Sequence, residues 1–407
     1  SGGKPQRMPL AIAALAVWTL GWTAPIHLRV QPRRIGMHSA TQQTVHASAA
    51  EAKGLDDGRV SVQAQANNFV SRKAALVEGL RREYNSFFRP MEEELYAPGL
   101  TFSDPLSSLE GVAAYKNNVD MLSGDSKFGR LLFADCGLVM HNVTTDSPES
   151  RSLCTRWTLQ FRFKLLPWRP LAQFTGVSQY TLDDQARVLR QQDYWDSINM
   201  QPGGSYAPAG KVAGLLDMLK QFMPRSSAEA AGDRELPYQL LRRAAQYEVR
   251  RYPQYIAVVT EYERRLDGLG TLGAYTGGAN EASEELKAYV PSLISAPDSA
   301  QEPKRMRWPM MVPALERDTP PPPKPSGRLD GFARLEMVPS QVVAVLSFSD
   351  PTTEEVTRGY AKMLKSLVEA DGLRVAETDL RLAQYDAVNS LKQRRSEVWV
   401  ELAEHLW

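Results

Sequence analysis

The sequence has few of the residues that build metal and redox sites. Its 407 residues include only two cysteines and five histidines. Cys136 and Cys154 are too few for a disulfide scaffold, so they form either one bridge or two reduced, buried thiols. Three of the histidines lie in the first 50 residues, which leaves His141 and His405 for the rest of the chain. Zinc-ligand spacing, a Walker loop and a nucleophile elbow are all missing.

The chain also lacks an excess of positive charge outside its N-terminus. Five basic residues precede the first acidic residue, Glu51, so residues 51–407 carry 43 basic and 47 acidic residues. A body with this slightly negative charge has no large positive field to hold nucleic acid by counterion release. The composition, 43% hydrophobic and 23% charged, excludes a disordered or collagen-like chain. The length predicts roughly two to three domains.

The first 50 residues have the composition of a targeting leader. Pro9–Trp22 is apolar but shorter than the roughly 18–20 residues that span a bilayer, and basic residues precede it, as in a secretory signal. Residues 25–50 are rich in Arg, Ser, Thr and Gln and contain no acid, as in an organelle transit peptide. The two in series resemble the bipartite leader of algal plastid proteins. A membrane anchor or a disordered tail is the alternative.

The first part of the body has the pattern of a helix followed by a sheet. From about residue 64 to 96, apolar residues recur every three or four positions, which predicts a helix that Pro90 kinks or splits. In residues 155–163 apolar and polar residues alternate, so one face of that strand should be buried and the other exposed to solvent. The pattern therefore predicts a helix and a curved antiparallel sheet, an α+β plan. The four predicted strands are Gly129–Met140, Cys154–Leu166, Gly176–Leu182 and Arg187–Trp195.

A linker separates this unit from the next. Residues 201–210 are typical of a loop, and Lys211–Met223 predicts a short amphipathic helix with Val212, Leu216 and Phe222 on its apolar face. Pro224–Glu235 is polar and rich in small residues, so the domain boundary is placed there.

The second unit contains a faint internal repeat. A strand, a proline, a second strand, a helix and a further strand occur twice, once around Pro253 and once around Pro339. The first helix is predicted over Glu281–Val290, with the glycine-rich stretch before it, Gly268–Ala279, as a flexible loop. The second helix has the clearer signals, because Thr352–Glu355 is a capping box and Gly372 suits a left-handed C-terminal residue.

The second unit resembles the SOUL heme-binding family. The resemblance rests on Tyr247–Tyr255, Met311-Val-Pro313, Val342–Phe348 and Arg394–Trp399, and it covers about residues 236–407. It implies a distorted β-barrel with two helices that binds heme or free porphyrin in an apolar groove beside the first helix. The sequence departs from the family in its glycine-rich lead-in, in an expanded loop over Ser292–Lys304 and at Met311, where the family has threonine.

The first unit resembles a plastid domain of uncharacterised function that is similar to the nuclear-transport-factor-like α+β cone. The likeness rests on Leu80–Tyr84, Phe102–Pro105, Leu166–Pro170 and Gly176–Tyr180. In plants and algae this domain occurs ahead of a SOUL domain, as it does here. The resemblance implies four segments. These are a leader and linker over 1–63, the conical domain over 64–200, a linker with a short helix over 201–235, and a SOUL-like domain over 236–407.

The resemblance also suggests residues for a tetrapyrrole site. Heme iron prefers His, Met, Cys or Tyr ligands, and cationic side chains can pair with the propionates. The metal ligand itself is left unassigned, because His405 is the only histidine of this domain and Met residues at helical spacing are typical core residues. The candidate cofactor-binding residues are Leu286, Tyr289, Val290, Met311, Arg250, Lys287 and His405.

The sequence thus predicts a plastid tetrapyrrole-binding protein that acts as a carrier or buffer and is not an enzyme. One alternative is a protein that binds plastid membranes or lipid bodies peripherally and binds no heme. The other is an enzyme in the conical domain, where Asp104, Tyr115, His141 and Asp196 could line a pocket.

Overall fold

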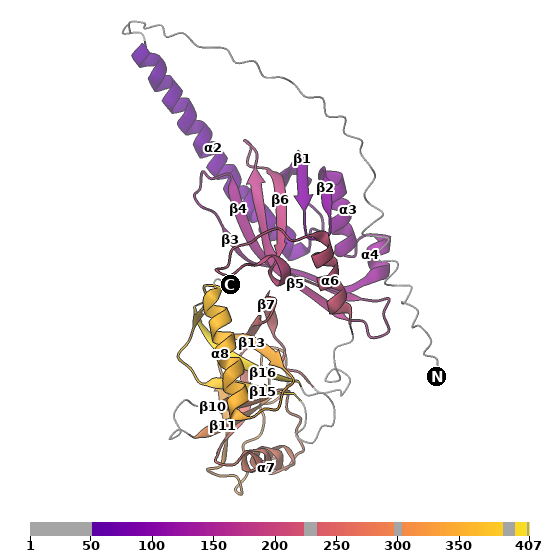
Figure 1. The fold of residues 1–407 in the computed structure, drawn as a ribbon, viewed down its shortest axis with the longest axis vertical. Helices are drawn as coiled ribbons and strands as arrows, with labels where there is room; N and C mark the ends of the chain where they lie inside the picture. Colours follow the sequence, from indigo (N-terminus) through magenta and orange to yellow (C-terminus); the bar gives the residue numbers. More distant parts are fainter. Residues whose placement is uncertain (1–50, 224–233, 297–302, 386–394, 405–406) are drawn as a thin grey trace.

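The computed structural model describes residues 51–223, 234–296, 303–385, 395–404 and 407. The predicted leader, His405 and most of the predicted boundary segment, residues 224–233, lie outside this range. Within it, two α+β units lie one above the other along the long axis of the molecule (Figure 1). No helix of the described part is long and apolar enough to cross a membrane.

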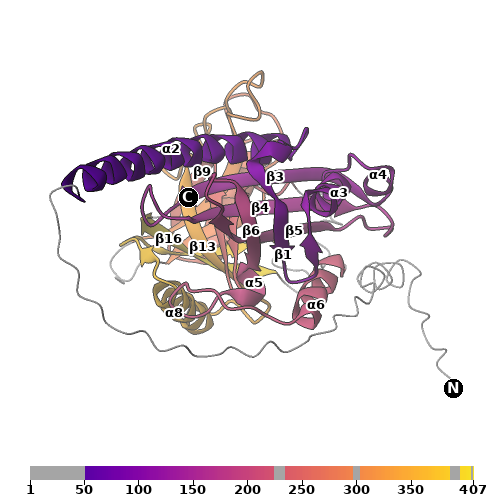
Figure 2. The same cartoon turned by 90° about the horizontal axis from the view of Figure 1, so that it is seen from above.

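The N-terminal domain is a long helix packed against a six-stranded curved sheet (Figure 2). The strands lie in the order β2-β1-β6-β5-β4-β3, antiparallel except for the β1–β6 pair. The helix α2 begins at Glu51, within the segment predicted as leader and linker, and ends at Ser86, before Pro90. The elements are α2 (Glu51–Ser86), η1 (Glu93–Leu95), β1 (Tyr96–Ser103), β2 (Ser108–Glu110), α3 (Val112–Leu122), α4 (Lys127–Leu132), β3 (Phe133–Thr144), β4 (Ser152–Phe163), β5 (Leu171–Leu182), β6 (Val188–Trp195), α5 (Asp196–Asn199) and α6 (Lys211–Phe222).

The C-terminal domain is a ten-stranded sheet with two helices. The sheet is not closed, so the predicted barrel is an open, curved sheet whose main path runs from β12 to β7. The internal repeat is visible in the pairing, because β9 pairs with β12 and β8 pairs with β13. The elements are β7 (Gln239–Arg243), β8 (Glu248–Tyr252), β9 (Tyr255–Tyr262), α7 (Arg265–Thr276), β10 (Ser292–Ala296), β11 (Lys304–Met311), β12 (Ala333–Val338), β13 (Gln341–Phe348), α8 (Glu354–Ala370), β14 (Arg374–Val375), β15 (Leu380–Gln384) and β16 (Ser396–Glu404).

The first helix of this domain is not where the sequence pattern placed it. The glycine-rich stretch forms the helix α7, whereas residues 281–290 are irregular and the predicted loop over Ser292–Lys304 contains the strand β10. Leu272 and Tyr275 of α7 are fully buried, and a Cβ at Gly268 would lie only 3.0 Å from the ring of Tyr262. Gly268 thus lets α7 approach the sheet closely, and this packing outweighs the low helix propensity of glycine.

The helix α8 and the linker helix α6 follow the prediction in position. The N-cap of α8 is Thr353, one residue after the Thr352 that begins the predicted capping box, and it accepts a hydrogen bond from the Val356 N–H; Gly372 has a φ of 75°. The buried face of α6 differs from the predicted one, because it carries Asp217 and Gln221 and leaves Val212 and Leu216 exposed. These two polar residues face inward because Asp217 pairs with Arg243 and the Gln221 side-chain oxygen accepts a hydrogen bond from the Gln173 N–H at 2.7 Å.

One buried carboxyl in the N-terminal domain makes stability depend on pH. Glu83 accepts hydrogen bonds from the Tyr96 hydroxyl (2.6 Å) and the Glu92 N–H (2.7 Å), yet burial raises its pKa from 4.5 to about 7. The folded state holds this proton more tightly than the unfolded chain does. The contribution of protonated Glu83 to the free energy of unfolding is therefore fully present below pH 4.5 and falls by about 3 kcal/mol as the pH rises to 7. We expect Glu83→Gln to gain stability relative to wild type between pH 5 and pH 8.

Urea unfolding of wild type and Glu83→Gln at pH 5 and at pH 8 checks this prediction. The exposed Glu110 provides the control, since Glu110→Gln makes the same chemical change at a carboxyl outside the buried site. If the free energy of unfolding of Glu83→Gln differs from that of wild type by the same amount at pH 5 and pH 8, the assignment is contradicted.

Candidate functional site

A cleft of about 810 Å³ separates the two domains. Its N-terminal wall is formed by residues of β4, β5 and α6, including Gln160, Gln173 and Lys220. Its C-terminal wall is formed by the β7–β8 hairpin and β13, including Tyr238 and Phe348. The outer face of the N-terminal sheet, which the alternation in residues 155–163 predicted to be exposed to solvent, therefore faces the other domain.

Arg243 fixes the two walls of the cleft to each other. It lies at the end of β7 and forms an ion pair with Asp217 of α6, at 2.5 Å from Nη2 to Oδ2. Its Nε donates to the Gln173 carbonyl (3.0 Å), and its backbone N–H donates to the Thr175 hydroxyl (2.7 Å). A second bond between the domains joins the Thr158 hydroxyl to the Leu240 carbonyl (2.8 Å). The orientation of the domains is thus set by specific polar contacts.

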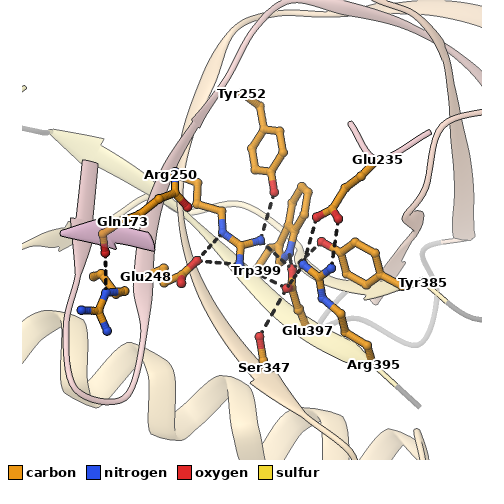
Figure 3. A network of polar contacts seen from close by, with 11 residues as sticks. Gln173, Glu235, Glu248, Arg250, Tyr252, Ser347, Tyr385, Arg395, Glu397 and Trp399 are labelled. Carbon is orange, nitrogen blue, oxygen red and sulfur yellow. Dashed lines mark hydrogen bonds and ion pairs between the residues drawn. The ribbon is translucent and has the colours of Figure 1, made fainter. Parts of the chain in front are cut away.

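Behind the C-terminal wall lies a buried charge network centred on Glu397 (Figure 3). Glu397 of β16 is fully buried and forms a bidentate ion pair with Arg250 of β8, at 3.0 and 3.2 Å. Arg395 reaches the same carboxylate at 3.0 Å and also binds Glu235. Tyr385 and Trp399 donate to the same carboxylate oxygen at 2.8 and 2.9 Å.

Charge neutralisation decides the ionisation of Glu397. Burial by itself would raise the pKa, but the guanidiniums of Arg250 and Arg395 outweigh burial and lower the pKa of Glu397 to about 2. Glu248 supplies a further carboxylate to Arg250 at 2.6 Å. The network therefore carries ionised, mutually paired groups along one side of the cleft, and Glu235, Glu248, Arg250 and Arg395 contribute to the cleft lining.

The predicted cofactor-binding residues fall into separate places. Tyr289 and Met311 are buried near the end of β11, where the Tyr289 N–H donates to the Pro309 carbonyl (2.7 Å) and its hydroxyl donates to Glu316 (2.7 Å). Val290 and Leu286 are partly buried nearby, and Lys287 is exposed. Of the candidates that the structure describes, Arg250 alone lines the cleft, where Glu397 and Glu248 already pair with it; His405 lies outside the described residues. Their role in cofactor binding stays a prediction.

The proline-rich segment packs against the C-terminal end of α7, which is the first helix of this domain in the structure. The Tyr275 hydroxyl donates to the Pro323 carbonyl (2.7 Å), and the Ser326 N–H donates to the Ala279 carbonyl (3.1 Å). Residues 323–326 therefore run along the C-terminal end of α7. The sequence pattern could not show this contact, because a proline-rich loop carries no signal for its packing partner.

The four polar residues considered for an enzyme site do not meet. Asp104 closes a turn by accepting from the N–H groups of Leu106 and Ser107. Tyr115 packs between aromatic rings in the core. His141 bonds to Thr158 at 2.8 Å, and Asp196 forms an ion pair with Arg156, so both lie on the sheet face toward the other domain. Burial, together with Arg156 and Arg251, lowers the pKa of His141 to about 4.

The cleft can be tested against the chemistry that heme requires. Its described lining residues include no histidine, methionine or cysteine, and burial raises the pKa of its two tyrosines, Tyr238 and Tyr247, which disfavours the phenolate that would bind iron. The exposed Lys220 supplies a cation that can pair with a carboxylate. Within the described residues no cluster of three metal-binding side chains occurs, and both cysteines are free. The described lining can therefore contact the macrocycle but offers little coordination to the iron.

The comparison with protein families identifies both domains. Residues 234–401 match the SOUL heme-binding protein family. Residues 74–191 match an uncharacterised conserved protein family, DUF2358. The expected order, a separate N-terminal domain followed by a SOUL domain, is confirmed, and the helix and six-stranded sheet of the first domain agree with the predicted α+β plan. A search of curated proteins finds no match.

Solved structures resemble parts of the chain at low identity. The epoxide hydrolase/cyclase-like enzyme SalBIII is 15% identical, with a TM-score of 0.25 over 31% of this chain and 91% of that one. An NTF2-like protein of unknown function from Cytophaga hutchinsonii is 14% identical, with a TM-score of 0.22 over 30% and 89%. The C-terminal domain of EcmrR is 12% identical, with a TM-score of 0.29 over 41% and 99%.

Proposed function

We propose that this protein binds a tetrapyrrole, either heme or a free porphyrin, in the cleft between its SOUL domain and its N-terminal domain. The observation that carries the proposal is the cleft itself, about 810 Å³ on the surface of a domain that matches a heme-binding family. Pockets for small molecules and cofactors are about 300–1,000 Å³ in volume. A macrocycle is a flat apolar ligand of the size that such a cleft accepts.

Three kinds of side chain would hold the ligand. The rings of Tyr238 and Phe348 and the side chain of Leu171 offer apolar contact for the macrocycle. Lys220 would pair with a propionate at the rim. Because the described lining offers no imidazole, thioether or thiolate, most of the affinity would come from burial of the macrocycle.

We further propose that the protein is a carrier or buffer rather than an enzyme, and that it works in a plastid. Binding without a strong iron ligand supports the carrier role, since a cargo must be released as well as held. The composition of residues 1–50 supports plastid targeting. Import into isolated chloroplasts, with processing of residues 1–50 as the readout, tests the localisation separately from binding.

Titration with hemin and with protoporphyrin IX tests the binding proposal. We expect saturable one-to-one binding of both, with affinities within about threefold of each other, because little of the affinity depends on iron ligation. Ala245 is exposed at the β7–β8 turn and lines the cleft, so Ala245→Phe should weaken both by about tenfold or more by filling it. Soret absorbance for hemin and fluorescence for protoporphyrin IX are the readouts.

The matched control is Ala274→Phe, an exposed alanine on α7 far from the cleft. It should leave both affinities unchanged. Weakening by Ala274→Phe alone would instead place the ligand beside α7, near Leu286 and Tyr289. Loss of hemin binding in His405→Ala would make that histidine the iron ligand. Absence of saturable binding to either tetrapyrrole would reject the proposed function.

A further inference from the structure

One end of the N-terminal sheet exposes apolar side chains from two segments. The helix α4 contributes Phe128 and Leu131, and the β4–β5 loop contributes Leu165 and Trp168; these four are between 42% and 58% exposed. The segments adjoin, because the Lys164 N–H donates to the Leu132 carbonyl at 2.8 Å. We call this end of the domain the α4 tip. Figures 1 and 2 place α4 at the far end of the sheet.

The α4 tip is also basic. Lys127, Arg130, Lys164 and Arg169 are exposed there, and none of the four forms an ion pair with another residue of the described chain. Asp125 and Asp135 at the same end are already paired, Asp125 with Arg89 at 3.9 Å and Asp135 with Arg162 at 3.0 Å, so Asp120 of α3 is the one neighbouring carboxylate with no ion pair in the described chain. The tip thus has a local positive charge, although residues 51–407 as a whole are slightly negative. Such a charge separation orients a protein toward a negatively charged surface.

The apolar side chains at the tip are held in place by the fold. The Trp168 indole N–H donates to the Phe222 carbonyl at 2.9 Å, so the ring is oriented with part of its surface exposed. A Cβ at Gly129 would lie 2.2 Å from the Met121 carbonyl oxygen, so α4 packs directly against α3. Ser126 caps α4 by accepting from the Gly129 N–H at 2.9 Å. The tip is therefore a built surface.

We infer that the α4 tip docks on the surface of a membrane that contains anionic lipids. An oriented tryptophan at the same end of the domain as exposed leucine and phenylalanine side chains suits the boundary between headgroups and acyl chains, where aromatic rings concentrate. The unpaired lysines and arginines around it complement anionic headgroups. The inference concerns a face of the N-terminal domain outside the cleft and holds whether or not a tetrapyrrole binds.

Flotation of the full chain with phosphatidylcholine vesicles, with and without phosphatidylglycerol, tests the inference. We expect binding that requires phosphatidylglycerol, and a loss of about tenfold or more in Leu131→Ser/Trp168→Ser. The matched control is Leu266→Ser/Phe332→Ser, which removes two exposed apolar residues (74% and 68%) from the C-terminal domain and should bind like wild type. The apolar residues 9–22 are present in every variant, so their contribution cancels in the comparison.

Two further measurements separate a membrane from other partners. Lys127→Glu/Arg130→Glu should lower vesicle binding most at low salt, since screening weakens exposed charges. Brominated lipid should quench the fluorescence of wild type more than that of Trp168→Phe, because it quenches only rings that enter the bilayer. Equal flotation of the tip and control variants would overturn the inference. Binding independent of phosphatidylglycerol, or equal quenching of wild type and Trp168→Phe, would overturn it as well.

Discussion

Replacing Glu397 with glutamine is expected to destabilise the C-terminal domain by about 3–5 kcal/mol, the cost of breaking a buried ion pair by removing one partner. The substitution keeps the shape of the side chain but leaves Arg250 and Arg395 without their shared carboxylate. Glutamine also replaces an acceptor with an NH₂ group, so the Tyr385 hydroxyl and the Trp399 N–H would compete for fewer lone pairs. Urea unfolding followed by tryptophan fluorescence measures the loss.

The same residue predicts how stability changes with acid. The folded pKa of Glu397 is about 2 and its unperturbed value is 4.5, so the folded state favours the ionised form. This contribution, about 3 kcal/mol, is fully present above pH 4.5 and is lost as pH falls toward 2. The difference between wild type and Glu397→Gln should therefore shrink as pH is lowered from 5 to 3.

A surface glutamate shows what an ordinary ion pair contributes. Glu261 pairs with Arg305, and both side chains are well exposed. Glu261→Gln should change stability by less than about 1 kcal/mol. A Glu397→Gln variant no less stable than Glu261→Gln would show that the buried network contributes no more than a surface pair.

Replacing Arg243 with alanine is expected to uncouple the two domains. The variant loses the ion pair to Asp217 and the bond to the Gln173 carbonyl, and it leaves Asp217 buried without its cation. A buried carboxylate that loses its partner costs about 3–5 kcal/mol, which is comparable to the energy that holds two domains together. We expect one cooperative thermal transition in wild type and two in Arg243→Ala, measured by differential scanning calorimetry.

Arg264 is the matched control for Arg243. It is exposed at the start of α7, away from the domain interface, and Arg264→Ala should keep the wild-type transition. Asp217→Asn should reproduce part of the Arg243→Ala effect, because it removes the other half of the same pair. If the tetrapyrrole binds between the domains, Arg243→Ala should also weaken its binding. A single transition in Arg243→Ala would show that other contacts, such as the Thr158–Leu240 bond, hold the interface.

Four of the six strands of the N-terminal domain could be predicted from their pattern, but β1, β2 and the domain that covers the sheet could not. Residues 129–132, predicted as the start of a strand, lie in the helix α4. Trp157, Phe161 and Phe163 point into the core, as the alternation in β4 requires. The opposite face carries threonine, arginine and glutamine, which indicates solvent in an isolated strand. Thr158 and Thr175 on that face are buried in the structure because the C-terminal domain covers them. A hydroxyl that bonds to another domain has the same sequence signal as one that bonds to water.

The misplaced helix of the SOUL domain has a similar cause. Residues 281–290 contain good helix formers, whereas residues 265–276 contain three glycines, so local propensity favoured the wrong segment. In the fold, Asn280 closes a turn by donating to the Glu284 carbonyl at 2.7 Å, and Ser283 adopts a φ of 56°, which prevents a helix there. Only contact with Tyr262 and the sheet shows why Gly268 belongs in a helix.

The sequence by itself determined the α+β class, most strand positions and the helix α8, because these depend on periodicity and on local capping chemistry. The order of the two domains followed from the resemblance of each half to a known family. The tertiary structure decided the cleft between the domains and the Glu397 network, whose residues come from positions up to 160 apart. It also decided the α4 tip. Burial and pairing between distant segments leave no periodic signal along the chain, so such sites appear only when the chain is folded.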